Sequence, residues 1–161
     1  MDNWNIGHKI VDFIKSRLSD GKQILELGSG AGTAELVKNW KVKSIEEDQQ
    51  FINSYHNDYI HCPIVDGWYD VKQLEKLKSV RWDLLLIDGP AHGLRSNMMK
   101  HFELFKFEVG QIIVADDVER NDDSKALSEL EKKLQENFAV IREDFDSIGA
   151  KKFSVLTLGE K

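Results

Sequence analysis

The chain has 161 residues, a formal net charge of −6 at pH 7 and one cysteine, Cys62. Its length fits one domain, residues 1–161, and its acidic balance disfavours nucleic acid as a partner, because no general attraction to a phosphate backbone exists. A single cysteine allows no internal disulfide and fits a reducing compartment. No apolar stretch approaches the roughly 20 residues of a membrane span, and no signal peptide is recognisable, so we expect a cytoplasmic protein.

The predicted elements alternate between helix and strand. Apolar residues at helical spacing predict an opening helix within residues 6–18, so that residues 1–20 form an N-terminal helical segment and 21–161 the core. Strands are predicted at 23–27, 42–45, 58–61, 82–87 and 111–115, and an antiparallel pair at 139–143 and 153–158. Helices are predicted at 33–40, 48–55, 71–77, 94–105 and 124–138, the last one capped by Asp123 or Ser124. This alternation predicts a three-layer α/β/α sandwich around a mostly parallel, Rossmann-like sheet.

A glycine-rich turn follows the first predicted strand. Gly28, Gly30 and Gly32 alternate with Ser29 and Ala31, and Thr33 opens the next predicted helix. Glycine permits left-handed backbone conformations and a close approach of a ligand. The second strand then ends at Glu46 and Glu47. A strand, a glycine turn, a helix and a strand that ends in an acid is the arrangement that binds a nucleoside, with the acid at the ribose hydroxyls.

The spacing of this motif distinguishes between nucleoside cofactors. The dinucleotide fingerprint places its third glycine where this chain has Thr33. Glu26, just before the turn, would be repelled by a pyrophosphate but attracted by a sulfonium amino acid. The pattern Glu-x-Gly-x-Gly-x-Gly resembles motif I of class I S-adenosylmethionine-dependent methyltransferases. That resemblance implies a seven-stranded sheet whose last strand is antiparallel.

The resemblance also implies which residues bind S-adenosylmethionine. Glu46 would hold the ribose hydroxyls, Glu47 would border the adenine, and the glycines would lie beside the amino-acid end of the cofactor. The end of the third predicted strand, at Cys62, would contact the adenine ring. The full set of expected cofactor-binding residues is Glu26, Gly28, Ser29, Gly30, Gly32, Thr33, Glu46, Glu47, Cys62 and Asp88.

Three carboxylates follow the fourth and fifth predicted parallel strands. Asp88 ends one strand, and Asp116 and Asp117 end the other, with no lysine or arginine immediately adjacent in the sequence. Neighbouring strands bring such residues to one rim, where clustered acids favour a hard cation such as Mg²⁺. The arrangement resembles the metal-dependent small-molecule O-methyltransferases of the catechol and caffeoyl-CoA type. In that family an Asp-Asn pair ends the fifth strand, so Asp117 replaces an asparagine. Alternatively, Asp116 and Asp117 open a solvated loop, and Asp88 hydrogen-bonds the cofactor or a neighbouring amide.

Two departures from this family affect the expected chemistry. The family carries a lysine three residues after the fourth-strand aspartate, where this chain has Ala91 followed by His92. An imidazole with an ordinary pKa near 6.5 is mostly neutral at physiological pH, so His92 is a candidate base beside Asp88. Only about twenty residues precede the first strand, fewer than is usual in this family, so either the pocket is open, a partner subunit completes it, or the substrate is large. Arg95 could hold a substrate carboxylate.

The sequence therefore predicts methyl transfer from S-adenosylmethionine to an oxygen of a small molecule, with a divalent metal and a homodimer as further expectations. Two alternatives stay open. The chain could bind S-adenosylmethionine without catalysing a reaction, since the family lysine is missing. It could also be an NAD(P)-dependent oxidoreductase, although Thr33 in place of a glycine argues against this class.

Overall fold

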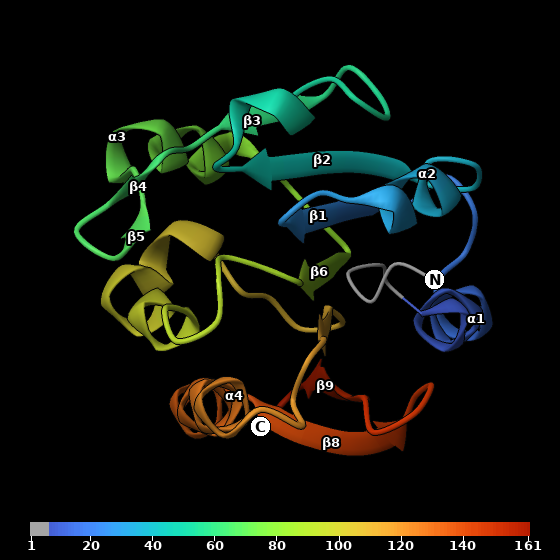
Figure 1. Ribbon diagram of the computed structural model, residues 1–161. Coiled ribbons are helices and arrows are strands. Elements are labelled where there is room, and N and C mark those ends of the chain that lie inside the picture. The colour runs from blue at the N-terminus through green and yellow to red at the C-terminus, as the bar shows by residue number, and fades with distance from the viewer. Residues whose placement is uncertain (1–6) are drawn as a thin grey trace.

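The computed structural model describes residues 7–161, and a seven-stranded sheet forms its centre (Figure 1). Neighbours in the sheet from β3 to β7 are parallel, whereas β9 is antiparallel to both β7 and β8. The strands lie in the order β3 (Tyr59–His61), β2 (Lys41–Glu46), β1 (Gln23–Leu27), β6 (Leu84–Ile87), β7 (Ile112–Ala115), β9 (Lys152–Gly159) and β8 (Ala139–Asp146). The predicted fold class, with its antiparallel last strand, is confirmed.

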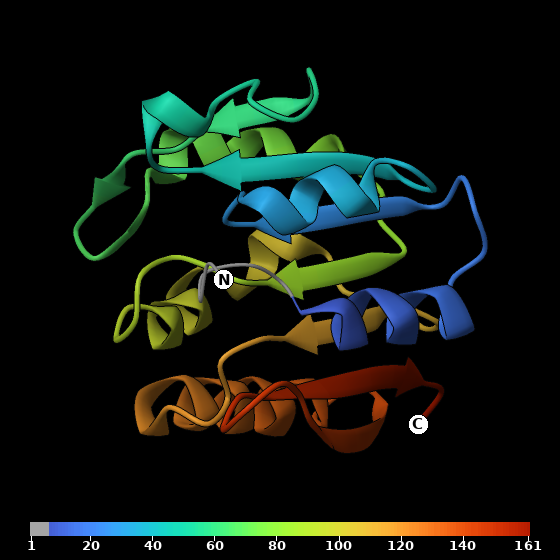
Figure 2. The ribbon, with the colours of Figure 1, turned by 45° about the vertical axis from the view of Figure 1, so that its right-hand side comes forward.

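Helices cover both faces of the sheet, which is why β6 and β7 are buried along their whole length. On one face lie α1 (His8–Arg17) and α2 (Ala31–Leu36), which Figure 2 shows on the near side of the strands. The opposite face packs against α3 (Val71–Leu74), the 3₁₀ helices η2 (Glu75–Ser79) and η3 (Arg95–Phe105), and α4 (Asn121–Leu134). The remaining elements are the 3₁₀ helix η1 (Gln49–Phe51) and a hairpin of β4 (Ile64–Val65) and β5 (Trp68–Tyr69).

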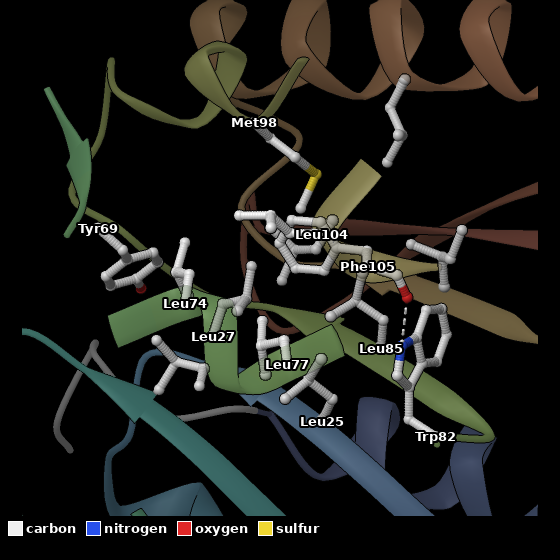
Figure 3. Packing of buried hydrophobic residues seen from close by; sticks show 14 of the residues in the cluster. Leu25, Leu27, Tyr69, Leu74, Leu77, Trp82, Leu85, Met98, Leu104 and Phe105 are labelled. Carbon is white, nitrogen blue, oxygen red and sulfur yellow. Dashed lines mark hydrogen bonds between the residues drawn. The ribbon is translucent and has the colours of Figure 1, made fainter. Parts of the chain in front are cut away.

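The larger hydrophobic cluster lies between the sheet and η3 (Figure 3). Leu25 and Leu85 from neighbouring strands contribute side chains with no exposed surface. Trp82 packs with them, and its indole N–H donates a hydrogen bond to the carbonyl of Phe105 over 2.9 Å. This bond satisfies the polar atom of a buried tryptophan and fixes the end of η3 against the sheet.

Several predicted boundaries shift in the structure. The helix predicted at 33–40 spans Ala31–Leu36, and the one predicted at 94–105 is a 3₁₀ helix with a kink at His101. The last helix begins at Asn121 after Arg120, so the prediction that Asp123 or Ser124 caps it is wrong. Asp123 instead lies buried in the first turn of α4. The part of the predicted N-terminal segment at residues 1–6, including Ile6, lies outside the described residues, and the division into 1–20 and 21–161 stays a prediction.

The topology brings seven chain segments to one edge of the sheet. The strands β1, β2, β3, β6, β7 and β8 end there, and the antiparallel strand β9 begins there. In open α/β sheets, ligands bind beyond the carboxyl ends of the parallel strands. None of the helices within residues 7–161 combines the length and the hydropathy that a membrane span requires.

Candidate functional site

The glycine turn after β1 packs directly on the turn after β6. Gly28 has a φ of +86°, and a Cβ atom there would lie 2.7 Å from the carbonyl oxygen of Asp88. Only glycine fits this position, because any side chain would collide with backbone and strain the left-handed conformation. Gly30 differs, since a Cβ atom there would meet nothing within 4 Å. Gly28 is therefore required by the fold, whereas Gly30 leaves open space beside the turn.

Glu46 lies opposite this turn at the end of β2, and only 6% of its surface is exposed. Its Oε1 accepts a hydrogen bond of 3.0 Å from the amide of Ser29, and its Oε2 accepts one of 2.9 Å from the amide of Asp48. The backbone amide of Cys62 binds the Glu46 carbonyl at 2.8 Å. These contacts hold one carboxylate in a defined orientation between two turns, where it keeps lone pairs for a ligand hydroxyl.

Glu26 lies beneath the glycine turn and is fully buried. The hydroxyl groups of Thr33 and Ser44 donate hydrogen bonds of 2.9 Å and 2.8 Å to its Oε1. Thr33 Oγ1 also accepts the amide of Gly30 at 3.1 Å, so the buried acid is linked to the turn through one hydroxyl. Burial raises the pKa of Glu26 from 4.5 to about 8, even though both hydroxyl contacts lower it.

A cavity of about 970 Å³ opens between these turns. Nine of the residues expected at the site line it: Gly28, Ser29, Gly30, Glu46, Glu47, Asp88, His92, Asp116 and Asp117. Within residues 7–161, four expected cofactor-binding residues lie outside its lining: Glu26, Gly32, Thr33 and Cys62. Glu26 and Thr33 support the turn from below, and Cys62 is buried in the core, where its thiol pKa is raised to about 12.

The three expected acids meet at one end of this cavity. Asp88, Asp116 and Asp117 each offer a carboxylate oxygen within 4.8 Å of the other two. Burial and the neighbouring Asp116 raise the pKa of Asp88 well above its ordinary value, and burial and Asp117 raise the pKa of Asp116 to about 6. Asp117 adopts a φ of +61°, a left-handed conformation that aspartate and asparagine tolerate better than most residues. The prediction that these acids converge is confirmed.

Basic side chains from three separate segments join this acid cluster. Arg95 donates a hydrogen bond of 3.2 Å to Oδ2 of Asp117. Arg120 and Lys151 approach Oδ1 of Asp117 at 3.5 Å and 4.0 Å. No lysine or arginine is immediately adjacent to these acids in the sequence, but the fold brings basic side chains to them from other segments.

These cations bear on whether the cluster fits a divalent ion. Three carboxylates alone are a suitable donor set for a hard cation. However, both oxygens of Asp117 already face cations, and two unit charges 4 Å apart interact by about 4 kcal/mol at an effective dielectric of 20. A metal would have to displace these ion pairs while it experiences repulsion from the same side chains. The ion pairs around Asp117 therefore oppose a resident divalent ion.

Arg95 differs from its expected role. Its side chain is 6% exposed, its Nε donates to the carbonyl of Pro90 at 3.1 Å, and its Nη1 donates to the carbonyl of Asp116 at 3.0 Å. With the third contact to Asp117, each guanidinium nitrogen is engaged by the protein's own acceptors. Arg95 also lines the cavity, but its contacts with the protein's own acceptors oppose the idea that it holds a substrate carboxylate.

His92 lines the cavity between the acid cluster and the start of α4, with 53% of its side chain exposed. Its Nδ1 lies 3.4 Å from Oδ2 of Asp123, and its Nε2 lies 3.7 Å from Oδ2 of Asp122. Asp123 is buried and also contacts Arg95 and Arg120, each at 3.7 Å. The histidine is thus oriented by an acid from another element of the chain.

Several lining residues were not predicted from the sequence. Phe51 and Tyr55 contribute aromatic surface, and Arg120 and Lys151 contribute charge. A signal for Lys151 was present, because an antiparallel last strand begins at the edge where its parallel neighbours end. The aromatic residues had no comparable signal, since their approach depends on how η1 and the residues after it pack.

Comparison with solved structures agrees with this fold. An O-methyltransferase from Bacillus cereus in complex with S-adenosylhomocysteine superposes with a TM-score of 0.67 at 14% identity, over 96% of this chain and 83% of that one. A candidate O-methyltransferase from Klebsiella pneumoniae gives 0.66 at 14% identity, over 95% and 79%. A candidate rRNA methylase from Clostridium thermocellum gives 0.62 at 15% identity, over 96% of each chain.

No protein-family model and no curated protein sequence matches this chain. The structural likenesses, at these low identities, establish that the chain has the class I S-adenosylmethionine-dependent methyltransferase fold.

Proposed function

We propose that this protein is an S-adenosylmethionine-dependent methyltransferase that acts on an oxygen of a small molecule. The observation that carries the proposal is the pairing of Glu46 with the glycine turn. A buried carboxylate fixed by the amide of Ser29 faces the cavity beside Gly30, which has open space where a side chain would project. This is the arrangement expected for a ribose with an attached amino-acid chain.

The cavity residues divide into two groups. Gly28, Ser29, Gly30 and Glu46 would hold the amino-acid and ribose parts of the cofactor, and Glu47 with Phe51 would border the adenine. When bound, S-adenosylmethionine supplies an electrophilic methyl group, which the acceptor oxygen takes as the methyl–sulfur bond breaks. Alignment of donor and acceptor supplies most of the rate enhancement in such a reaction.

At the other end of the cavity, His92 would take the acceptor's proton. A proton on Nδ1 directed at Asp123 leaves Nε2 to accept, and the resulting imidazolium would lie near Asp122 and Asp123. Burial and Asp116 raise the pKa of Asp88 well above its ordinary value, which favours the protonated form, and a protonated Asp88 would donate a hydrogen bond to the acceptor.

The proposed methyl transfer requires no metal ion. The expectation that Asp88, Asp116 and Asp117 hold Mg²⁺ stays a prediction, favoured by their mutual proximity and opposed by the cations around Asp117. We also retain as proposals the cytoplasmic location and a homodimer whose second chain covers the acceptor end of the cavity, which is the part lined by Asp88, His92, Asp116 and Asp117. Light scattering coupled to gel filtration tests the homodimer.

Calorimetric titration with S-adenosylhomocysteine tests the proposal. We expect micromolar binding by the full chain and a loss of about 100-fold or more in Glu46→Ala, which removes charge-assisted hydrogen bonds of about 1.5–3 kcal/mol each. Glu35→Ala is the matched control, because Glu35 is an exposed acid on α2. Absence of binding, or equal affinity in Glu46→Ala, would refute the proposal. Tight binding without methyl transfer to any acceptor would instead favour a cofactor-binding protein without catalysis.

A further inference from the structure

The acid cluster at the acceptor end contains its own counter-charge. Asp88, Asp116 and Asp117 come from the ends of β6 and β7, where a metal-dependent enzyme would place its ligands. The basic side chains that reach the cluster come from the start of η3, from the residue before α4 and from the residue before β9: Arg95, Arg120 and Lys151. Three separate segments thus deliver one cation each to the same group of acids.

Arg95 is a permanent part of this arrangement. Its buried guanidinium bonds the carbonyls of Pro90 and Asp116 and the carboxylate of Asp117, and so connects the turn after β6 with the turn after β7. A buried cation with three protein acceptors cannot leave without orphaning all of them. One oxygen of Asp117 is therefore committed to an arginine.

Arg120 and Lys151 occupy the other oxygen of Asp117. Their side chains are 33% and 30% exposed, and both line the cavity. The Oδ1 atom of Asp116, in turn, accepts the amide of Asp117 at 2.8 Å. One oxygen of Asp116 and both oxygens of Asp117 thus already face a backbone N–H group or a cation.

We infer that Arg95, Arg120 and Lys151 replace a divalent ion as the counter-charge of this cluster, so that the acceptor end works without a metal. Arg120 and Lys151 are then positioning residues: they keep Asp117 in place and repel metal ions from the lining of the acceptor end. The functional part of this inference rests on the proposed methyl transfer, but the exclusion of metal does not, and it can be measured on the protein alone.

The test is a Mn²⁺ titration of the full chain, followed by electron paramagnetic resonance and calorimetry. We expect the unaltered protein to bind Mn²⁺ no more tightly than millimolar. The double variant R120M/K151M should bind it at least about tenfold more tightly, because two repelling charges are gone and the carboxylates stay. The matched control R81M/K41M removes the same charge at the opposite edge of the sheet and should leave Mn²⁺ binding unchanged.

Three results would overturn the inference. One is submillimolar Mn²⁺ binding by the unaltered protein that disappears in Asp116→Ala. Another is a folded R120M/K151M that binds no better than the control, because Arg120 and Lys151 would then not be what excludes the metal. If circular dichroism shows that R120M/K151M does not fold, Lys151→Met alone should still bind Mn²⁺ severalfold more tightly than the unaltered protein. The third overturning result is unchanged Mn²⁺ affinity in Lys151→Met. Titration of the same samples with S-adenosylhomocysteine reports separately on the proposed function.

Discussion

Substitution of Glu26 by glutamine should change how stability depends on pH. The folded protein raises the pKa of this carboxyl from 4.5 to about 8, because it is buried beneath the glycine turn. A group with a raised pKa binds its proton more tightly in the folded state, so its contribution is most favourable below pH 4.5 and is lost as pH rises towards 8. Between pH 5 and pH 7 this loss amounts to about 2.5 kcal/mol, since the slope approaches about 1.36 kcal/mol per pH unit.

Urea unfolding at pH 5, 6 and 7 measures this effect. Glutamine resembles the protonated glutamic acid and cannot ionise, so the free energy of unfolding of Glu26→Gln relative to the unaltered protein should rise by about 2.5 kcal/mol across this range. Comparison of the two proteins removes most of the contributions of Asp88 and Asp116, since Glu26 is only the smallest of the causes that raise the pKa of Asp88. Glu35→Gln, an exposed neighbour on α2, should show no such trend. A pH-independent difference between Glu26→Gln and the unaltered protein would refute the assigned pKa and its burial-based cause.

The remaining predictions concern the turns and the acceptor end. Gly28→Ala should lower the free energy of unfolding by about 2 kcal/mol or more, because Gly28 has a positive φ and its added Cβ would collide with the backbone of Asp88. Gly30→Ala should fold normally but weaken S-adenosylhomocysteine binding, because its added Cβ projects into open space. Urea denaturation and calorimetry measure the two effects, and equal behaviour of the two variants would contradict both predictions. Arg95→Met should cost about 3–5 kcal/mol in urea unfolding by leaving one oxygen of Asp117 and two carbonyls without their partner, while Arg81→Met, on a 91% exposed side chain, should cost less than about 0.5 kcal/mol. His92→Ala should lower kcat with unchanged S-adenosylhomocysteine affinity, and Asp123→Asn should also lower kcat because it weakens the contact that orients the imidazole. An unchanged kcat in His92→Ala would count against His92 as the base.

The sequence alone determined the layers of the fold and the cofactor end of the site. Continuous apolar runs such as residues 84–87 predicted buried parallel strands, because only a sheet covered on both faces lacks a polar side. The glycines and Glu46 could be recognised because each is adjacent to a strand end, and strand ends of a parallel sheet share one edge. Local pattern therefore sufficed wherever one residue and its immediate neighbours set the geometry.

Tertiary structure decided the charge balance of the acceptor end. Nothing near Asp117 in the sequence indicated that Arg95 would reach it, because that contact depends on how η3 packs on the sheet edge. The antiparallel last strand placed Lys151 at the same edge, but only the packing of the start of β9 brought it to Asp117. The same packing buried Asp123 inside the first turn of α4 beside His92, where the sequence had indicated a helix cap. Electrostatic interactions act through space over several ångströms, so the sign and strength of a charged cluster follow from the folded arrangement and not from adjacency along the chain.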